Sequence, residues 1–387
     1  ASMLIINGKL LMDKDFEYAD LLVEEGRIAE ILPYRSGKED PDTYDARGSI
    51  VVPGLIDLEV HGAGGYDMSD ACPEAYETIG QELLKRGVTT YLGAIDSFDT
   101  DILREAYEEA GKWMSQERPG AQMAGLQMRG PFLNPEAAGN QDKGALKLPD
   151  LALYEELQSL SGGNIKVVHL SPELEGAREF MRAASQTSQI ALSNSTADFD
   201  TARWGYACGA SWCSDLFRNM PTFSVTQPGL IGAAMDIARI VTLRFENDDF
   251  IHPSLLRMAF NEFWGRLCLV SGMTAYTGLP SGRYEIEGHI VSKKRDRARF
   301  EDGGDAGSVL GLDACMSAIM GMGSVPAPLV FRAATEMPAR ALGIFDEVGS
   351  ITVGKRADLT VLDLHTHNVQ TVFRKGEMVW DERKEYI

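Results

Sequence analysis

The feature that most constrains the fold is a regular alternation, through the middle of the chain, of short apolar runs with longer helical patterns. Such an alternation favours parallel strands joined by crossover helices. Helical patterns occur, for example, at residues 74–86, 101–116, 174–184 and 254–263. The apolar runs number eight, which is the strand count of a (β/α)8 barrel. They are residues 55–60, 89–94, 124–128, 165–170, 190–193, 212–216, 240–245 and 267–270.

Both ends of the chain have a different pattern. Residues 1–52 contain short strand-like runs, with a hairpin turn predicted at Glu25-Gly26, and residues 346–387 are similar. Neither end is long enough to be a domain. We therefore expect an α/β fold in which residues 53–345 form a TIM-like (β/α)8 barrel. Residues 1–52 and 346–387 are expected to form one small β-sandwich-like subdomain, and residues 293–307 a mobile loop after the eighth strand.

The charge and cysteine content limit the partners and the compartment. The chain has 57 acidic and 37 basic residues and a formal net charge of -20, which opposes binding to nucleic acid or to an anionic membrane, although a local basic pocket can still hold a phosphate. The five cysteines are scattered and favour a reducing compartment. We find no signal peptide and no apolar run of the roughly 18 residues that a membrane span needs. The sequence thus predicts a cytoplasmic protein without nucleic-acid or membrane partners.

Polar side chains follow several of the predicted strands. In a (β/α)8 barrel the chemistry lies at the C-terminal ends of the strands. His169 lies within the fourth strand instead, and we expect it to be a buried, hydrogen-bonded core residue. No Gly-x-Ser-x-Gly elbow and no hydrolase triad is present in the sequence. The strand ends carry, in order, Glu59, His61, Arg129, Asn194, Asp215 and Gly272.

Five segments carry longer motifs. They are VPGLID at 52–57 with EVHGAGG at 59–65, GLQMRGPFLNP at 125–135, LSPE at 170–173, ALSNST at 191–196 and SDLFRNMP at 214–221, and the tail reads GSITVGKRADL at 349–359. Over nearly the whole chain and in the same order, these segments resemble the N-acetylglucosamine-6-phosphate deacetylase family of the amidohydrolases. The family's counterparts of the middle four are motifs ending Glu-Gly-Pro-Phe-Leu-Asn-Pro, then Ala-Pro-Glu, Gly-His-Ser-Asn-Ala-Thr and Thr-His-Leu-Tyr-Asn-Ala-Met-Pro.

The resemblance implies metal-dependent hydrolysis of the acetamide group of an N-acetylated amino-sugar phosphate. It also implies a divalent metal such as zinc, held by a Glu and two His, and an Asp that transfers protons. This chain departs from that set at nearly every position. By the resemblance, Arg129 stands for the Glu ligand, Leu192 and Asp215 for the two His ligands, Gly272 for the catalytic Asp, Phe250 for a substrate-contacting His and Thr226 for the Arg that grips phosphate.

Three hypotheses of function stay open, and they leave enzymatic activity undecided. The chain is a family member that no longer runs the family reaction, or an enzyme of altered chemistry, or a non-catalytic protein that binds or senses a sugar phosphate. The altered enzyme would use Glu59, His61 and Asp215 as metal ligands or acid–base groups. We expect no cofactor and no metal, and those same three residues as ligands if one binds. The expected ligand is a small phosphorylated amino sugar or a related carbohydrate, and the resemblance implies a homodimer.

Arg129 has a specific predicted role. It should lie between Glu59 and Asp215 and take the place of the metal, because a guanidinium bonds carboxylates in two directions and stays charged. No catalytic residue is assigned. The predicted barrel-mouth pocket comprises Glu59, His61, Arg129, Asn194, Asp215, Arg218, Asn219 and His252.

Overall fold

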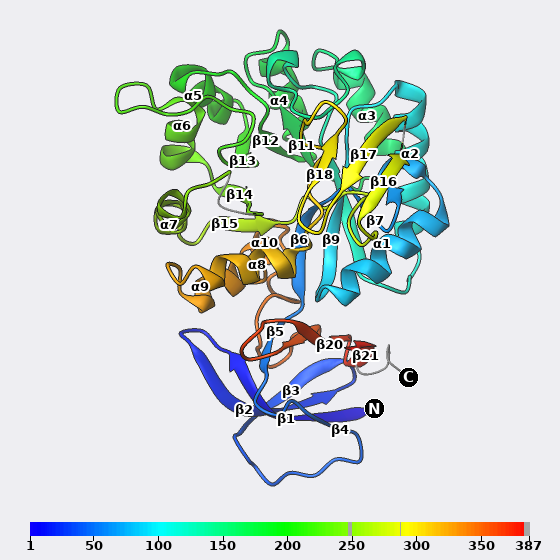
Figure 1. Cartoon of the computed structure of the whole chain (residues 1–387), viewed down its shortest axis with the longest axis vertical. Coiled ribbons are helices and arrows are strands. Elements are labelled where there is room, and N and C mark those ends of the chain that lie inside the picture. The colour runs from blue at the N-terminus through cyan, green and yellow to red at the C-terminus, as the bar shows by residue number, and fades with distance from the viewer. Residues whose placement is uncertain (247–249, 287, 383–387) are drawn as a thin grey trace.

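The eight apolar runs form eight parallel strands around a barrel (Figure 1). A computed structural model describes residues 1–246, 250–286 and 288–382. The barrel strands follow one another around the sheet in the order in which they occur along the chain, and most strand residues are buried, as in sheets covered on both faces. The strands are β6 (Leu55–Val60), β9 (Val88–Ile95), β10 (Gln122–Met128), β11 (Ile165–Leu170), β12 (Gln189–Leu192), β13 (Ala210–Cys213), β14 (Ile240–Arg244) and β15 (Leu267–Val270).

The barrel is closed between its first and last strands by the residues that follow β15. The amide of Gly272 donates to the carbonyl of Glu59 at 3.0 Å, and the amide of His61 donates to the carbonyl of Met273 at 2.9 Å. Inside the barrel, the side chains of Ile56, Leu58 and Trp212 pack in one apolar cluster. The C-terminal end of β6 is thereby tied to the segment after β15.

Helices cover the outside of the barrel, as the predicted crossovers require. Their inward faces share one large apolar core with the outward faces of the strands. No helix within the described ranges is long and apolar enough to cross a membrane. The helices are α1 (Pro73–Lys85), α2 (Thr100–Met114), α3 (Leu151–Leu160), α4 (Ala177–Ala184), α5 (Phe199–Ala207), α6 (Gly229–Ile237), α7 (Pro253–Glu262), α8 (Leu312–Gly321), α9 (Ala327–Arg332) and α10 (Glu336–Ala341).

The two ends of the chain meet in one eight-stranded sheet, apart from the barrel strands in Figure 1. Glu25 and Gly26 have φ of 51° and 75°, which suits the predicted two-residue hairpin turn. The two ends are joined where β5 pairs with β19, and β5 leads directly into β6. The strands are β1 (Ser2–Leu11), β2 (Phe16–Glu24), β3 (Arg27–Pro33), β4 (Thr43–Asp45), β5 (Ile50–Pro53), β19 (Leu359–Leu362), β20 (Val369–Arg374) and β21 (Glu377–Asp381).

The predicted loop at residues 293–307 is wrong in part. The chain after β15 forms a three-stranded antiparallel sheet of β16 (Gly282–Ile286), β17 (His289–Lys293) and β18 (Ala298–Phe300). Buried Val291 and Ala298 give this sheet a small apolar core of its own. The charged side chains that suggest a loop lie on its exposed face and in its turns. A short hairpin (β7, Gly62–Ala63, with β8, Tyr66–Asp67) follows β6.

Candidate functional site

The strand ends project side chains into the barrel mouth from unusual backbone conformations. Asn194 after β12, Asp215 after β13 and Gly272 after β15 have φ of 48°, 60° and 62°. Asn and Asp tolerate this left-handed region better than most residues, and glycine adopts it freely. Residues held in such conformations persist only where the surrounding structure fixes them. Asp215 also explains why β13 ends at Cys213, short of the predicted Leu216.

Arg129, immediately after β10, occupies the centre of this mouth. Its Nε lies 3.1 Å from a carboxylate oxygen of Glu59, and one terminal nitrogen lies 3.7 Å from Asp215. All three side chains are buried. Burial alone would raise the pKa of Glu59, but Arg129 and His61 outweigh it and hold that pKa well below its ordinary value. The guanidinium is therefore placed between the two carboxylates, as the sequence predicts.

The other terminal nitrogen of Arg129 is also held. It donates to Ser193 Oγ at 3.1 Å, Asn194 Oδ1 at 3.2 Å and His169 Nδ1 at 3.2 Å. Since Nδ1 accepts, Nε2 of His169 carries the proton and donates to Gln127 Oε1 at 2.6 Å. Burial, and then the charge of Arg129, lower the pKa of His169, so this imidazole is neutral. His169 is thus the buried, hydrogen-bonded core residue that the sequence predicts.

His61 is held by two carboxylates. Its Nε2 lies 3.3 Å from Glu59 and its Nδ1 lies 3.2 Å from Asp96, which follows β9. Burial alone would lower the pKa of His61, but Asp96 and Glu59 outweigh it and raise the pKa from 6.5 to about 10. His61 is therefore an imidazolium at neutral pH, with no free ring nitrogen to accept a proton.

Arg244, the last residue of β14, fills the space beside Gly272. A Cβ placed on Gly272 would lie 2.8 Å from Cδ of Arg244 and 3.2 Å from Glu59 Oε2. The Nε of Arg244 lies 3.6 Å from Glu246. Burial alone would lower the pKa of Arg244, but neighbouring carboxylates, Asp215 first, outweigh it and raise the pKa. A second guanidinium, 12% exposed, thus lies beside Gly272, which by the resemblance stands for the family's catalytic Asp.

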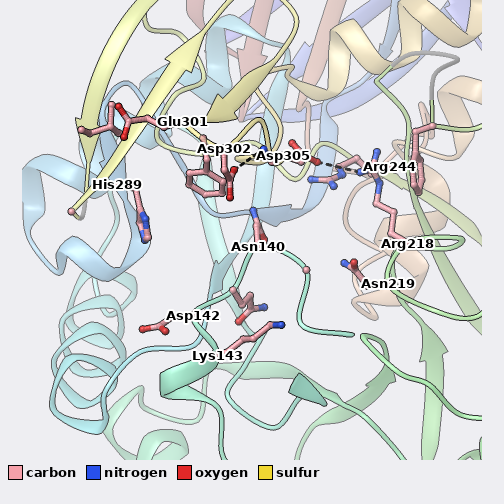
Figure 2. Close-up of a pocket in the computed structure, with 17 residues that line it drawn as sticks. Asn140, Asp142, Lys143, Arg218, Asn219, Arg244, His289, Glu301, Asp302 and Asp305 are labelled. Carbon is pink, nitrogen blue, oxygen red and sulfur yellow. Dashed lines mark hydrogen bonds and ion pairs between the residues drawn. The ribbon is translucent and has the colours of Figure 1, made fainter. Parts of the chain in front are cut away.

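Two cavities meet at this point. The inner cavity, of about 50 Å³, is lined by Glu59, His61, Arg129 and Asp215 among others, and has room for only a few water molecules. The outer cavity, of about 1030 Å³, opens in front of it. The cavities share Arg244 and the polar side chains of Asn140, Gln141 and Asn219. Arg129 and Arg244 therefore occupy the inner part of the mouth, and a large polar space lies in front of it. Figure 2 shows the side chains that line this outer space.

The remaining predicted pocket residues separate into two groups. Arg218 and Asn219, in the loop after β13, line the outer cavity. The Cζ atom of Arg218 lies over the ring of Phe250, 3.6 Å from its centroid. His252 does not join them. It is exposed and caps α7, where its Nδ1 accepts from the amide of Ser254 at 3.2 Å, so its place in the predicted pocket is wrong.

A divalent metal does not fit these residues. A divalent ion about 4 Å from the Arg129 guanidinium would be repelled by roughly 8 kcal/mol at an effective dielectric constant of about 20. The carboxylates of Glu59 and Asp215 already face that guanidinium, and His61 is an imidazolium rather than a neutral ligand. Across residues 1–246, 250–286 and 288–382, no group of three or more His, Cys, Asp or Glu side chains is arranged to hold a metal.

Sequence reasoning missed Asp96 and Arg244. Both directly follow or end apolar runs, the second and the seventh, so they occupy the positions from which the other site residues were chosen. Asp305, which follows β18, was also missed, because residues 293–307 were expected to be a mobile loop after the eighth strand, from which no site residue was chosen. Its carboxylate lies 3.8 Å from Arg218. No motif singles it out.

The barrel, the polar cluster at its strand ends and the sheet made from both termini define an amidohydrolase-type protein, and residues 292–379 match the Amidohydrolase family model. The chain is 31% identical over 359 residues to N-acetylglucosamine-6-phosphate deacetylase of Bacillus subtilis (strain 168), which covers 91% of this chain and 90% of the relative. The chain belongs to the N-acetylglucosamine-6-phosphate deacetylase family. It is also 26% identical to N-acetylgalactosamine-6-phosphate deacetylase of Escherichia coli O157:H7, over 92% of this chain and 94% of the relative.

Solved structures share the fold. N-acetylglucosamine-6-phosphate deacetylase from Pasteurella multocida superposes with a TM-score of 0.91 at 23% identity, covering 98% of this chain and 99% of that one. A mutant of the Mycobacterium smegmatis deacetylase, in complex with N-acetyl-D-glucosamine-6-phosphate, superposes with a TM-score of 0.89 at 22% identity, covering 98% and 99%. These comparisons confirm the predicted barrel with its terminal sheet.

Proposed function

We propose that this chain is a deacetylase-family protein that does not run metal-dependent deacetylation and instead binds a small phosphorylated amino sugar or a related carbohydrate at the barrel mouth. The observation that carries this proposal is the position of Arg129. Its guanidinium lies 3.1 Å from Glu59 and 3.7 Å from Asp215, where it supplies the positive charge that the two buried carboxylates need. A charged residue that stabilises the resting site in this way leaves no role for a metal.

The same contacts argue against an altered acid–base enzyme. A general base needs a free lone pair and a pKa near the working pH. His61 is an imidazolium between two carboxylates, Glu59 is paired with Arg129, and the pKa of His169 is lowered while its Nδ1 accepts from Arg129. Each candidate proton carrier is therefore already engaged with a neighbouring charge or donor.

Binding is supported by the outer cavity. Its volume of about 1030 Å³ is enough for a sugar phosphate, since small-molecule sites commonly measure roughly 300–1,000 Å³. Arginine, lysine, asparagine and carboxylate side chains line it together, which suits a ligand with both hydroxyl and charged groups (Figure 2). The named ligands of the relatives are phosphorylated amino sugars.

The proposal is tested by measuring acetate release from N-acetylglucosamine 6-phosphate and N-acetylgalactosamine 6-phosphate, with and without added zinc. We expect no release above the uncatalysed background. The Bacillus subtilis relative, assayed in parallel, is the positive control. Turnover at rates typical of enzymes, roughly 1 s⁻¹ or more, would overturn the proposal.

Metal content separates binding from altered metal chemistry. The protein is purified without added metal, incubated with zinc, desalted and measured by elemental mass spectrometry. We expect much less than one equivalent of metal per chain. A stoichiometric metal that is lost on replacing Asp215 by Asn would instead support the altered enzyme.

A further inference from the structure

Two arginines at the inner end of the outer cavity lack hydrogen-bond acceptors. Each guanidinium offers five N–H donors. Within the described part of the chain, neither Arg218 nor Arg244 makes a hydrogen bond, and the buried Nε of each is unpartnered. Their nearest carboxylates, Asp215, Asp305 and Glu246, lie at 3.6–3.8 Å, beyond hydrogen-bond distance.

The Nε atoms face Asp215 and Glu246, so the donors left for a ligand are the terminal nitrogens of the two side chains, both of which line the outer cavity. The side chain of Arg218 is only 8% exposed and that of Arg244 12%. Figure 2 shows the two side chains next to each other at one end of the outer cavity. Burial and then the charge of Arg244 lower the pKa of Arg218, whereas neighbouring carboxylates raise the pKa of Arg244, so the two guanidinium groups repel each other and Arg218 is the less well compensated. An added anion would relieve both the repulsion and the missing hydrogen bonds.

The backbone holds Arg218 in this position at a cost. Phe217 and Asn219 on either side have φ of 73° and 50°, and a bulky residue such as phenylalanine rarely adopts that region. The ring of Phe250 packs against the Arg218 guanidinium, with 3.6 Å between the ring centroid and Cζ. The side chain is thus fixed before any ligand arrives, which favours tight and specific binding.

We infer that Arg218 and Arg244 form an oxyanion-binding site, so that the ligand group nearest the centre of the barrel is a phosphate or a carboxylate rather than a neutral acetamide. This inference rests on the proposed binding function and names the ligand class, a small carbohydrate with an oxyanion. Asp305 is the internal carboxylate that competes for Arg218. It is 44% exposed and is also held by Arg299 at 3.1 Å, so it can turn away when an anion binds.

The site is tested by calorimetric titration with four probes: inorganic phosphate, glucosamine 6-phosphate, glucuronate and uncharged glucose. We expect the oxyanion probes to bind, with an affinity that falls as salt rises, and glucose not to bind. A preference for phosphate or for carboxylate identifies the group. Equal binding of glucose and glucosamine 6-phosphate would overturn the inference.

Variants make the assignment specific. Arg218→Gln and Arg244→Gln should each weaken oxyanion binding by about tenfold or more. Arg218→Lys should weaken it by less, because lysine keeps the positive charge but cannot donate two parallel hydrogen bonds as a guanidinium does. Asp305→Asn should strengthen binding, because it removes the competing carboxylate. Arg178→Gln is the matched control: Arg178 stacks on Trp204 at 4.2 Å, much as Arg218 stacks on Phe250, but does not line the cavity.

Melting curves identify variants that fail to fold, and for these Arg218→Lys and Asp305→Asn carry the test. Unchanged affinity in the folded arginine variants, or no strengthening by Asp305→Asn, would overturn the site. The outcome is independent of the acetate-release assay. A chain that deacetylates but needs Arg218 for phosphate keeps this site and loses the proposed function. A chain that neither deacetylates nor binds an oxyanion loses this site, and it keeps the proposed function only if it binds an uncharged related carbohydrate.

Discussion

The side chain of Arg244 occupies the space that a side chain on Gly272 would need. A Cβ on Gly272 would lie 2.8 Å from Cδ and 3.1 Å from a terminal nitrogen of Arg244, and the backbone there has a φ of 62°. Arg244 lies on the seventh strand of the barrel and Gly272 follows the eighth. The absence of a carboxylate at 272 and the presence of a guanidinium from the neighbouring strand are therefore one coupled feature of the site.

This coupling predicts the outcome of restoring the aspartate. Gly272→Asp should lower the free energy of unfolding by about 2–4 kcal/mol, because it combines left-handed backbone strain with a steric clash. In an Arg244→Ala background the same change should cost about 1–2 kcal/mol less. Urea denaturation of the wild type, both single variants and the double variant measures the coupling. Equal costs in the two backgrounds would show that Arg244 does not fill this space.

Replacing Arg129 tests its role as the resident cation. Arg129→Glu places a third acid beside Glu59 and Asp215, and we expect it to lower the free energy of unfolding at pH 7 by about 3–5 kcal/mol. Arg129→Met, which removes the cation without adding an acid, should cost less. Zinc should raise the melting temperature of the glutamate variant but not of the methionine variant or the wild type. A wild-type protein stabilised by zinc as much as Arg129→Glu would contradict this role.

The fold could be predicted because its signals are repeated along the chain. Eight apolar runs and the helical patterns between them agree with one another, so a displaced boundary, such as Leu216 assigned to β13, does not change the architecture. The sheet of β16, β17 and β18 was missed because its charged, short strands bury few apolar side chains. Small sheets of this kind give almost no periodic signal.

The site could be predicted only where a motif marked it. Glu59, Arg129 and Asp215 lie in segments that resemble the family, and the structure brings them together. Arg244 has no such marker, and its importance depends on its distance from Gly272, which sequence does not give. His252 was misplaced: it lies two residues from Phe250, which by the resemblance stands for a substrate-contacting His, but its side chain accepts a hydrogen bond at the start of α7.

His61 should make stability fall at alkaline pH. Its pKa is raised from 6.5 to about 10 in the folded protein, because Asp96 and Glu59 outweigh burial. The folded state thus holds the proton on His61 more tightly than the unfolded state does. The contribution of His61 to the free energy of unfolding is therefore full below pH 6.5 and is lost as the pH rises through about 10. His61→Gln should therefore be less stable than the wild type at pH 6, by on the order of 2–4 kcal/mol.

Denaturation from pH 6 to pH 10 checks this pH dependence. The difference between wild type and His61→Gln should shrink steadily over that range. Exposed His365, replaced by Gln, serves as the control and should show little difference at any pH. A constant difference between wild type and His61→Gln would mean that His61 is not charged in the folded state.

The last prediction is that the barrel and the terminal sheet unfold together, as expected if residues 1–52 and 346–387 complete one subdomain that supports residues 53–345. Strand β5 pairs with β19 from Ile50 to Pro53 and continues into the barrel, and Thr360 Oγ1 donates to the carbonyl of Gly87 at 2.7 Å. The apolar core of the barrel also includes Ile50 and Val369 from the terminal sheet. Unfolding of either unit alone would therefore expose this shared apolar surface.

Two variants of the same residue type test this dependence. Val361 is fully buried in β19, and Val361→Asp should lower the free energy of unfolding by about 3 kcal/mol or more. Val353 is 56% exposed, and Val353→Asp should change it by less than about 0.5 kcal/mol. Because the units are coupled, Val361→Asp should shift one single transition, seen equally by far-ultraviolet circular dichroism and by tryptophan fluorescence, which reports on both units because Trp212 lies inside the barrel and Trp380 lies in β21. A fragment of residues 53–345 that unfolded as cooperatively as the full chain would show that the barrel is independent of its terminal sheet.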